Sequence, residues 1–231
     1  MARPKIHDDR LRLRLLDEGG RLLASEGPAA LTVRRLATLA GTSPAAIYGL
    51  FGDKWGLVEE MLHEGFRRFR ARIDLVERTA DPLADLRALG NAYRENALAN
   101  PHLYDLMFGH PFPQFEPGER VQRFAMEAFE ALVKAVQRCM DAGDFEGDTM
   151  AIASILFSDT HGLASLELAG WLGSREDAAL LWEQDLTARL YGLLTPAGRA
   201  AASRQSLAGR GMDSPPGAAD AVVPPEVLRT P

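Results

Sequence analysis

Apolar residues recur at helical spacing along most of this 231-residue chain, and Gly, Pro and helix-capping residues interrupt them. The pattern predicts an all-α protein with helices over about 8–25, 33–40, 44–51, 53–79, 82–100, 101–109, 117–142, 148–170 and 174–194. Beyond Thr195 the apolar period disappears, and residues 196–231 contain no aromatic side chain. A segment that offers so little apolar surface is predicted to be disordered.

The stretch 31–57 holds two short apolar-faced segments that meet at Gly41. The first has Thr32 as a potential N-cap, and four of its residues share one helical face: Val33, Leu36, Ala37 and Ala40. Gly41 is suited to end it, and Ser43 followed by Pro44 is suited to begin the second segment. Two short helices joined by such a turn are what a helix-turn-helix requires.

Helical geometry sorts the faces of the second segment. If Ile47 and Phe51 face the core, a rotation of 100° per residue points Ala45, Ala46, Tyr48 and Gly49 outward. Lys54 follows in the first turn of the next helix, beside Tyr48, where it is suited to hold a phosphate. This arrangement is typical of a helix-turn-helix that presents its second helix to the DNA major groove. The alternative interpretation is that these are three core helices with no role in binding DNA.

The helix predicted over 53–79 is long enough to connect an N-terminal head to the rest of the chain. It contains a Glu60-x-x-His63 motif, but the sequence has no second copy to complete a di-metal ligand set. Further along, the loop 109–117 has three prolines and two phenylalanines. An irregular apolar loop among helices is a candidate wall of a ligand cavity.

Charge is distributed unevenly along the chain. The net charge of −6 does not favour a nucleic-acid binder, but residues 1–56 carry nine Lys and Arg against six Asp and Glu. Residues 57–231 carry seventeen against twenty-six. A basic end on an acidic body is expected if only that end contacts phosphate. Residues 1–6 then form a basic arm that could enter a minor groove, or a frayed terminus.

The single cysteine, Cys139, excludes an internal disulfide and is interpreted as a packed thiol on a helix. No apolar run is long enough for a membrane span, and the first residues lack the apolar region of a signal peptide. We therefore expect a cytoplasmic protein with no metal and no cofactor.

The segment 31–57 resembles the DNA-binding head of the tetracycline-repressor (TetR) family. The matching residues are Leu31, Thr32, Leu36, Ala37, Ala40, Gly41, Ser43, Ile47, Tyr48, Phe51 and Lys54. Thr42 replaces the usual Val, and Ala45 the common Gly. The resemblance implies a three-helix head over 1–52, with an arm over 1–6. A long fourth helix joins this head to a ligand-binding and dimerisation body of about five further helices over 53–195, followed by the tail 196–231.

By position in the matched motif, the resemblance implies phosphate contacts from Thr32, Thr42, Ser43, Tyr48 and Lys54. It also implies that Arg34 reaches a guanine edge. The outward residues Ala45, Ala46 and Gly49 have no side-chain donors. We therefore expect thymine-methyl contacts, Arg34 and the deformability of the DNA to supply the specificity.

A second resemblance covers 93–109 and 159–167. Both stretches are similar to the C-terminal domain of a TetR subclass named for a Trp-His-Gly signature, in which His161 and Gly162 match and Thr160 replaces the Trp. The resemblance implies a small-molecule effector and a homodimer formed by the last two helices. The candidate pocket residues are Phe66, Tyr93, Tyr104, Met107, Phe108, Phe112, Phe115, Phe124, Phe129, Phe157 and His161. The candidate interface residues are Ile155, Leu163, Leu166, Trp182, Leu186, Leu190 and Leu193.

Together these features predict a ligand-responsive transcriptional regulator that is not an enzyme. It is expected to act as a repressor that a small apolar molecule releases from a palindromic double-stranded operator, without contact with a membrane. The residues leave other interpretations open. One is an enzyme using His161 and Asp159 for acid-base chemistry, and another is a helical adaptor. The pocket residues could be plain core, and the interface residues could pack inside a monomer.

Overall fold

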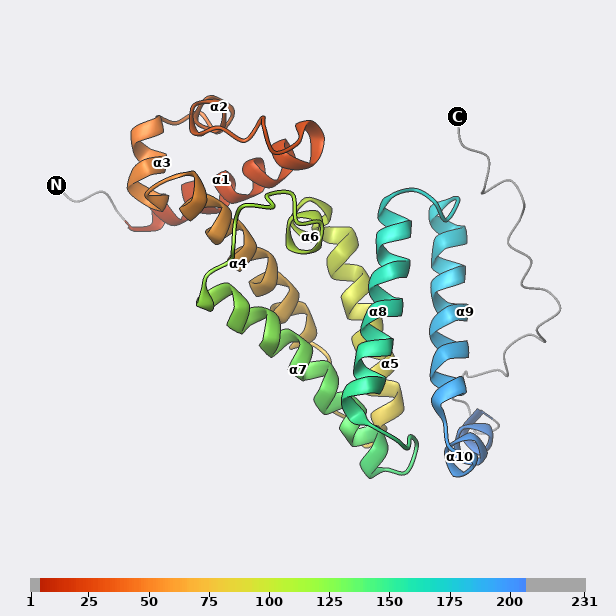
Figure 1. The fold of residues 1–231 in the computed structure, drawn as a ribbon. Coiled ribbons are helices and arrows are strands. Elements are labelled where there is room, and N and C mark those ends of the chain that lie inside the picture. Colours follow the sequence, from red (N-terminus) through yellow and green to blue (C-terminus); the bar gives the residue numbers. More distant parts are fainter. Residues whose placement is uncertain (1–4, 207–231) are drawn as a thin grey trace. The chain divides into compact units, whose positions relative to one another are not determined.

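The computed structural model describes residues 5–206, and the side chains of residues 9–203 within them. Every regular element in that part of the chain is a helix, which confirms the all-α fold class (Figure 1). The helices are α1 (Lys5–Glu26), α2 (Val33–Leu39), α3 (Pro44–Phe51), α4 (Lys54–Ile73), α5 (Pro82–Ala99), α6 (Pro101–Phe108), α7 (Glu119–Asp141), α8 (Thr149–Leu168), α9 (Arg175–Leu193) and α10 (Pro196–Ser206).

The chain divides into two compact units. Unit 1 contains the residues up to Arg72 and Ala99–Phe129, so it combines α1 to α4 with α6 and the first half of α7. Unit 2 contains Ile73–Leu98 and the chain from Glu130 onward, with α5, the rest of α7 and α8 to α10. The functional domains 1–52 and 53–195 are a different division, and they stay a prediction.

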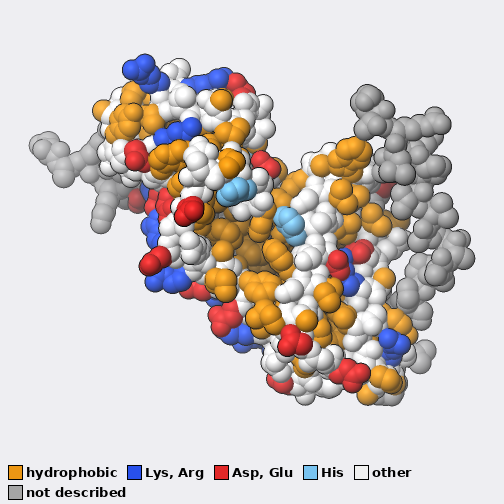
Figure 2. Space-filling model, in the orientation of Figure 1, with side chains coloured by type: hydrophobic (Ala, Val, Ile, Leu, Met, Phe, Trp, Pro, Cys, Tyr) orange, Lys and Arg blue, Asp and Glu red, His pale blue; other side chains and the backbone are white. Residues whose placement is uncertain are grey.

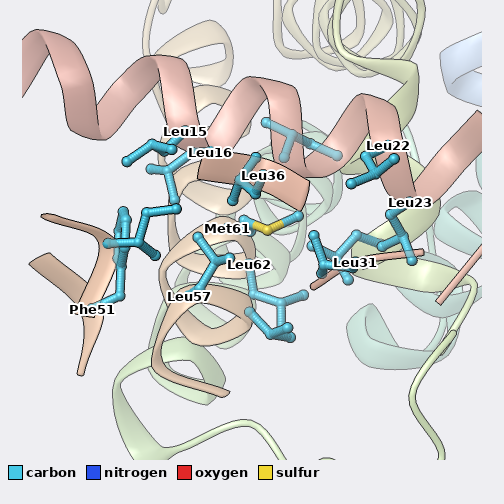
Figure 3. Packing of buried hydrophobic residues seen from close by; sticks show 14 of the residues in the cluster. Leu15, Leu16, Leu22, Leu23, Leu31, Leu36, Phe51, Leu57, Met61 and Leu62 are labelled. Atoms are coloured by element: carbon cyan, nitrogen blue, oxygen red, sulfur yellow. The ribbon is translucent and has the colours of Figure 1, made fainter. Parts of the chain in front are cut away.

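An apolar core forms in unit 1 where α1 to α4 pack together (Figure 3). Its most deeply buried side chains include Leu15, Leu16, Leu31, Leu36, Ile47, Leu57 and Met61. Burying a side chain of this size contributes about 1.5–3 kcal/mol. Gly19 lets α4 approach α1, because a Cβ there would lie 3.0 Å from Sδ of Met61. This core fixes the positions of α2 and α3.

Two helices of unit 2 begin where the sequence predicts. Asp148 accepts a hydrogen bond from the N–H of Ala151 at 2.7 Å and so caps α8. Ser174 and Asp177 form a reciprocal capping box at the start of α9, with hydrogen bonds of 3.1 and 3.0 Å. The buried thiol of Cys139 on α7 has its pKa raised by burial to about 12, which fits a packed thiol.

The prediction that the fourth helix extends to residue 79 is wrong, because α4 ends at Ile73. The N–H and hydroxyl of Thr79 donate to the carboxylate of Asp85 at 2.9 and 2.7 Å, and Arg138 donates to the Thr79 carbonyl at 2.7 Å. These tertiary hydrogen bonds replace the helical ones. Leu75, in the segment between α4 and Thr79, is 74% exposed.

Both chain ends are also more helical than predicted. Lys5 and Ile6, assigned to the basic arm, belong to α1, whereas residues 1–4 lie outside the described part. The prediction of disorder from residue 196 onward is wrong for the first eleven residues of that segment, which form α10. Thr195 begins this helix by accepting the N–H of Gly198 at 2.9 Å and donating its hydroxyl to the Gly143 carbonyl at 2.7 Å. Residues 207–231 lie outside the described part of the chain.

Three residues predicted for the dimer interface are buried inside unit 2. Trp182, Leu186 and Leu190 recur at one-turn spacing on α9, with exposed fractions of 2%, 4% and 1%. The indole N–H of Trp182 donates to Asn91 on α5 at 2.9 Å, and Leu186 packs on Gly90. A helix face enclosed within one subunit cannot contact another, so these three assignments are wrong.

No helix in residues 5–206 combines the length and the apolar character that crossing a membrane requires.

Candidate nucleic-acid interface

Glycine at position 41 makes the tight turn between α2 and α3 possible. Its φ is +60°, in the left-handed region that glycine adopts without steric penalty. The N–H of Gly41 donates to the Thr38 carbonyl at 3.2 Å, and the N–H of Thr42 donates to the Ala37 carbonyl at 2.9 Å. The chain therefore reverses within a few residues, and α3 packs directly against α2.

The faces of α3 divide as its pattern predicts. Ile47 is 0% and Phe51 is 8% exposed, whereas Tyr48 is 51% exposed. Ala45 and Gly49 are exposed beside Tyr48, and Ala46 is half-buried. The outward face of this helix therefore carries small, nearly apolar side chains and the phenol of Tyr48. Whether it contacts DNA stays a prediction.

Two hydroxyl residues on this side of unit 1 cap the helices that follow them. Oγ1 of Thr32 accepts the N–H of Arg35 at 3.3 Å, and Oγ of Ser43 accepts the N–H of Ala46 at 3.2 Å. Because each oxygen acts as an acceptor in its cap, its O–H can still donate to a phosphate. Both residues are exposed, and Thr42 between the helices is half-buried.

The basic side chains around α2 and α3 differ in their surroundings. Figure 2 shows Lys and Arg side chains at the surface of this part of the protein. Arg34 is exposed, whereas its neighbour Arg35 pairs with Glu26 at 2.5 Å. Lys54 is half-buried, and its Nζ lies 3.4 Å from the carbonyl oxygen of Pro28. Arg34 can therefore reach out directly, while Lys54 lies against the protein.

The turn from α3 to α4 depends on Gly56, for which the helical pattern of the sequence predicts no special role. Gly52 has a φ of +79°, and Asp53 caps α4 by accepting the N–H of Gly56 at 2.8 Å. A Cβ on Gly56 would lie 2.0 Å from the Phe51 carbonyl oxygen. Only glycine fits this approach of the two helices, which sets Lys54 next to α3. The sequence feature that could have identified this turn is the pair of glycines, Gly52 and Gly56, within five residues.

The eleven candidate pocket residues are shared between the two units. Eight lie in unit 1: Phe66, Tyr104, Met107, Phe108, Phe112, Phe115, Phe124 and Phe129. Within that unit, Phe108 lies 4.9 Å from Tyr104 and 6.4 Å from Phe66 between ring centroids. Phe112 and Phe115 pack instead on Trp55, at 5.6 and 5.5 Å. Their role in binding a ligand stays a prediction.

The other three residues, Tyr93, Phe157 and His161, form a cluster between α5 and α8 in unit 2. The phenol oxygen of Tyr93 lies 3.1 Å from Nδ1 of His161, and the imidazole stacks on Phe157 at 5.9 Å. Burial lowers the pKa of His161, which favours the neutral ring. A neutral Tyr-His pair next to a phenylalanine is suited to orient an uncharged, mostly apolar molecule.

The geometry does not pair His161 with Asp159 for acid-base chemistry. The Asp159 carboxylate lies 3.2 Å from Nε of Arg189 on α9, while His161 contacts Tyr93. No cluster of three or more His, Cys, Asp or Glu side chains that could hold a metal ion occurs in the described residues.

Four predicted interface residues keep some exposure on α8 and α9. Ile155 is 51% and Leu166 is 46% exposed, while Leu163 and Leu193 are half-buried. Leu181, on the outward side of α9, is 39% exposed and adds to this apolar surface. Figure 2 shows hydrophobic side chains over these two helices on the face in view. Together they leave an apolar surface on unit 2.

Two family models match the chain. The model of bacterial regulatory proteins of the tetR family matches residues 15–61, and that of the tetracyclin repressor-like C-terminal domain matches residues 86–189. The HTH-type transcriptional regulator Rv1816 of Mycobacterium tuberculosis is 24% identical over 199 residues, which cover 72% of this chain and 84% of that protein.

Solved structures share the fold. A protein of unknown function from Rhodococcus sp. RHA1 superposes with a TM-score of 0.68 and 30% identity, over 80% of this chain and 96% of that one. The TetR family transcriptional regulator PfmR from Thermus thermophilus has a TM-score of 0.67 and 22% identity, over 79% and 100%.

Proposed function

The chain belongs to the tetR family of bacterial regulatory proteins, and from that premise we propose that it is a repressor which a small apolar molecule releases from a palindromic operator. Family membership makes it a DNA-binding regulator. The observation that carries the proposal is the exposure of Tyr48 between the buried Ile47 and Phe51, because α3 is then anchored with its other face outward. No catalytic role is proposed.

Phosphate contacts and base contacts come from different residues in this proposal. The hydroxyls of Thr32, Thr42, Ser43 and Tyr48, with the ammonium of Lys54, hold the backbone. Arg34 supplies the polar base contact, and Ala45, Ala46 and Gly49 meet thymine methyl groups. In a twofold homodimer the two recognition helices lie about 34 Å apart on one side of the operator. Such a regulator acts in the cytoplasm, where the bacterial chromosome lies.

The test of operator binding is a gel-shift and binding-site selection with DNA from upstream of the chain's own gene. We expect a palindromic site, and we expect Arg34→Ala to lose preference for one guanine per half-site. A bidentate Arg–guanine contact is worth about 1–3 kcal/mol, so that preference should drop roughly 5- to 150-fold. An unchanged guanine preference would show that Arg34 does not read it.

Effector release depends on the body residues. A ligand can shift the protein only by binding one conformation more tightly than the other, and the Tyr93–His161 pair with Phe157 is the proposed polar anchor of the apolar ligand. A thermal-shift screen of apolar compounds with one hydrogen-bonding group should find molecules that also weaken operator binding. Tyr93→Phe should reduce the shift. Compounds that stabilise the protein yet leave operator affinity unchanged would contradict the effector mechanism.

A further inference from the structure

Two segments far from Lys54 in the sequence hold its side chain in unit 1. Its Nζ lies 5.1 Å from the ring centroid of Phe112, in the loop between α6 and α7, and 5.6 Å from that of Trp55. On the other side it donates to the Pro28 carbonyl at 3.4 Å, in the turn between α1 and α2. The Lys54 side chain therefore contacts both the turn that precedes the helix-turn-helix and the α6–α7 loop.

The Phe112 end of this arrangement is well anchored. Phe112 is 4% exposed and belongs to the apolar core that α1 to α4 share. Its ring meets Trp55 edge to face at 5.6 Å, and Phe115 stacks on the same indole at 5.5 Å. The loop thus places a ring at a fixed position beside the first turn of α4.

Further contacts join the same loop to the next turn of α4. The N–H of Gly118 donates to the carboxylate of Glu59 at 3.1 Å, and Arg120 pairs with Glu60. A side chain at position 118 would displace the Glu59 carboxylate, since its Cβ would lie 2.8 Å from Oε1. The loop and the start of α7 therefore follow the N-terminal half of α4 closely, and any shift of the loop changes the surroundings of Lys54.

The aromatic rings restrain the Lys54 ammonium more strongly than the Pro28 carbonyl does. A 3.4 Å hydrogen bond is long for N–H···O, whereas both aromatic rings lie within the 6 Å range of cation–π attraction. A lysine side chain has many rotamers, and ordering them on binding opposes association. An ammonium already held near one position loses less freedom when it meets a phosphate.

We propose that Phe112 is a positioning residue for Lys54, so that the α6–α7 loop sets how firmly the head holds the DNA backbone. The inference rests on the proposed function, in which Lys54 contacts a phosphate. It deepens that function by naming the loop as the part of unit 1 through which operator affinity can be adjusted. Phe112 acts through Lys54 and does not itself contact DNA.

A double-mutant cycle on the full chain tests this. Affinity for a short duplex from upstream of its gene is measured by fluorescence anisotropy over a salt series for wild type, Phe112→Leu, Lys54→Ala and the double variant. Lys54→Ala should reduce the slope of log affinity against log salt by about two per dimer, since each phosphate contact contributes roughly 0.9. Phe112→Leu should weaken binding roughly 5- to 30-fold in the wild-type background, and less than about twofold without Lys54.

Matched variants separate positioning from packing. Phe112→Tyr keeps the ring and should retain wild-type affinity, while Phe115→Leu removes a ring of the same loop that stacks on Trp55 and should change affinity less than about twofold. Melting temperatures of all variants are measured alongside. If Phe112→Leu does not fold, the cycle is run with Phe112→Met, which keeps more of the buried volume.

The outcomes distinguish the two proposals. Equal weakening by Phe112→Leu with and without Lys54 would overturn the positioning role alone, as would a loss with Phe115→Leu as large as that with Phe112→Leu. No effect of Lys54→Ala on affinity or salt slope would instead contradict the phosphate contact of the proposed function, and the inference with it. Absence of any DNA binding by the wild type would contradict the regulator itself.

Discussion

Gly49 lies within α3, where glycine weakens a helix, yet the surrounding fold does not require glycine there. A Cβ at this position would meet no atom within 4 Å. Gly56 is the opposite case, because a Cβ there would lie 2.0 Å from the Phe51 carbonyl oxygen. One glycine is thus dictated by packing and the other is not. The outward position of Gly49 lets the α3 backbone approach a partner closely.

Substituting Gly49 by alanine separates stability from DNA binding. Gly49→Ala should raise the free energy of unfolding by up to about 1 kcal/mol, because alanine favours the helix and fits without a clash. It should lower operator affinity, by about tenfold or more if the added methyl group meets the DNA. Urea denaturation and fluorescence anisotropy measure the two effects. A variant that gains stability and keeps full affinity would show that α3 does not approach DNA at this point.

Substituting Gly56 by alanine should have the reverse effect on stability. The added methyl group would overlap the end of α3, and overpacking of this kind typically destabilises by about 1–3 kcal/mol. In a chain of this size each kcal/mol lowers the melting temperature by about 2–4 °C. Thermal unfolding followed by circular dichroism checks this, with Gly49→Ala as the matched control. An unchanged melting temperature would mean that the α3–α4 turn can open at little cost.

At the scale of elements, partly buried ionic hydrogen bonds connect helices that lie far apart in the sequence. Asp85 on α5 accepts from Arg138 on α7 at 2.7 Å, and Glu167 on α8 accepts from Arg94 on α5 at 2.6 and 2.7 Å. Burial would raise the pKa of Asp85, but the hydrogen bonds from Thr79 and Arg138 outweigh it and hold the pKa below its ordinary value. The carboxylate therefore stabilises unit 2 in its ionised form.

The lowered pKa of Asp85 predicts an acid-sensitive contribution to folding. Its stabilisation is fully present above the unfolded-state pKa of about 4 and is lost as pH falls through the lower native pKa. Asp85→Asn should therefore destabilise by about 1–3 kcal/mol at neutral pH, with the difference from wild type shrinking below about pH 4. Urea denaturation across pH measures it. Lys134→Gln, which breaks the exposed pair with Glu130, is the control and should change stability by less than about 1 kcal/mol. A loss of stability that does not depend on pH would contradict the stabilising role assigned to the ionised Asp85 carboxylate.

At the scale of the whole molecule, the division of α8 and α9 into inner and outer faces decides what a second subunit can contact. Trp182, Leu186 and Leu190 stabilise the subunit itself, whereas Ile155, Leu166 and Leu181 lie outward. Apolar side chains exposed together on two helices are typical of an association surface. In the proposed homodimer these outward residues form the contact, and the twofold axis sets the distance between the two DNA-binding heads.

A charge introduced on the outer face should separate the subunits without unfolding them. We expect Ile155→Glu to convert the dimer to a monomer in analytical ultracentrifugation and to weaken operator binding, because each half-site is then bound alone. Trp182→Ala, on the inner face of α9, should instead destabilise the fold by about 3–5 kcal/mol in urea denaturation. An Ile155→Glu protein that remains a dimer would exclude this part of α8 from the interface.

Features set by residues within one helical turn were predictable from sequence. Thr32, Ser43 and Ser174 cap their helices through hydrogen bonds to the residue three positions on, and Ile47 and Phe51 are buried because they share one face of a short helix. The end of α4 was not predictable in this way, because Thr79 is held by Asp85 and Arg138. The same holds for Trp182, whose partner is Asn91 on another helix.

The sequence by itself determined that the chain is helical, where most helices begin, and which residues of 31–57 face inward, because caps and amphipathic periods act locally. Only the tertiary structure decided which face of α9 is covered, which glycine a close approach demands, and that Lys54 lies against Phe112. Those facts depend on helices distant in the sequence that compete for the same apolar surface. A helical period shows that one face must be buried, but only the packed fold shows against what.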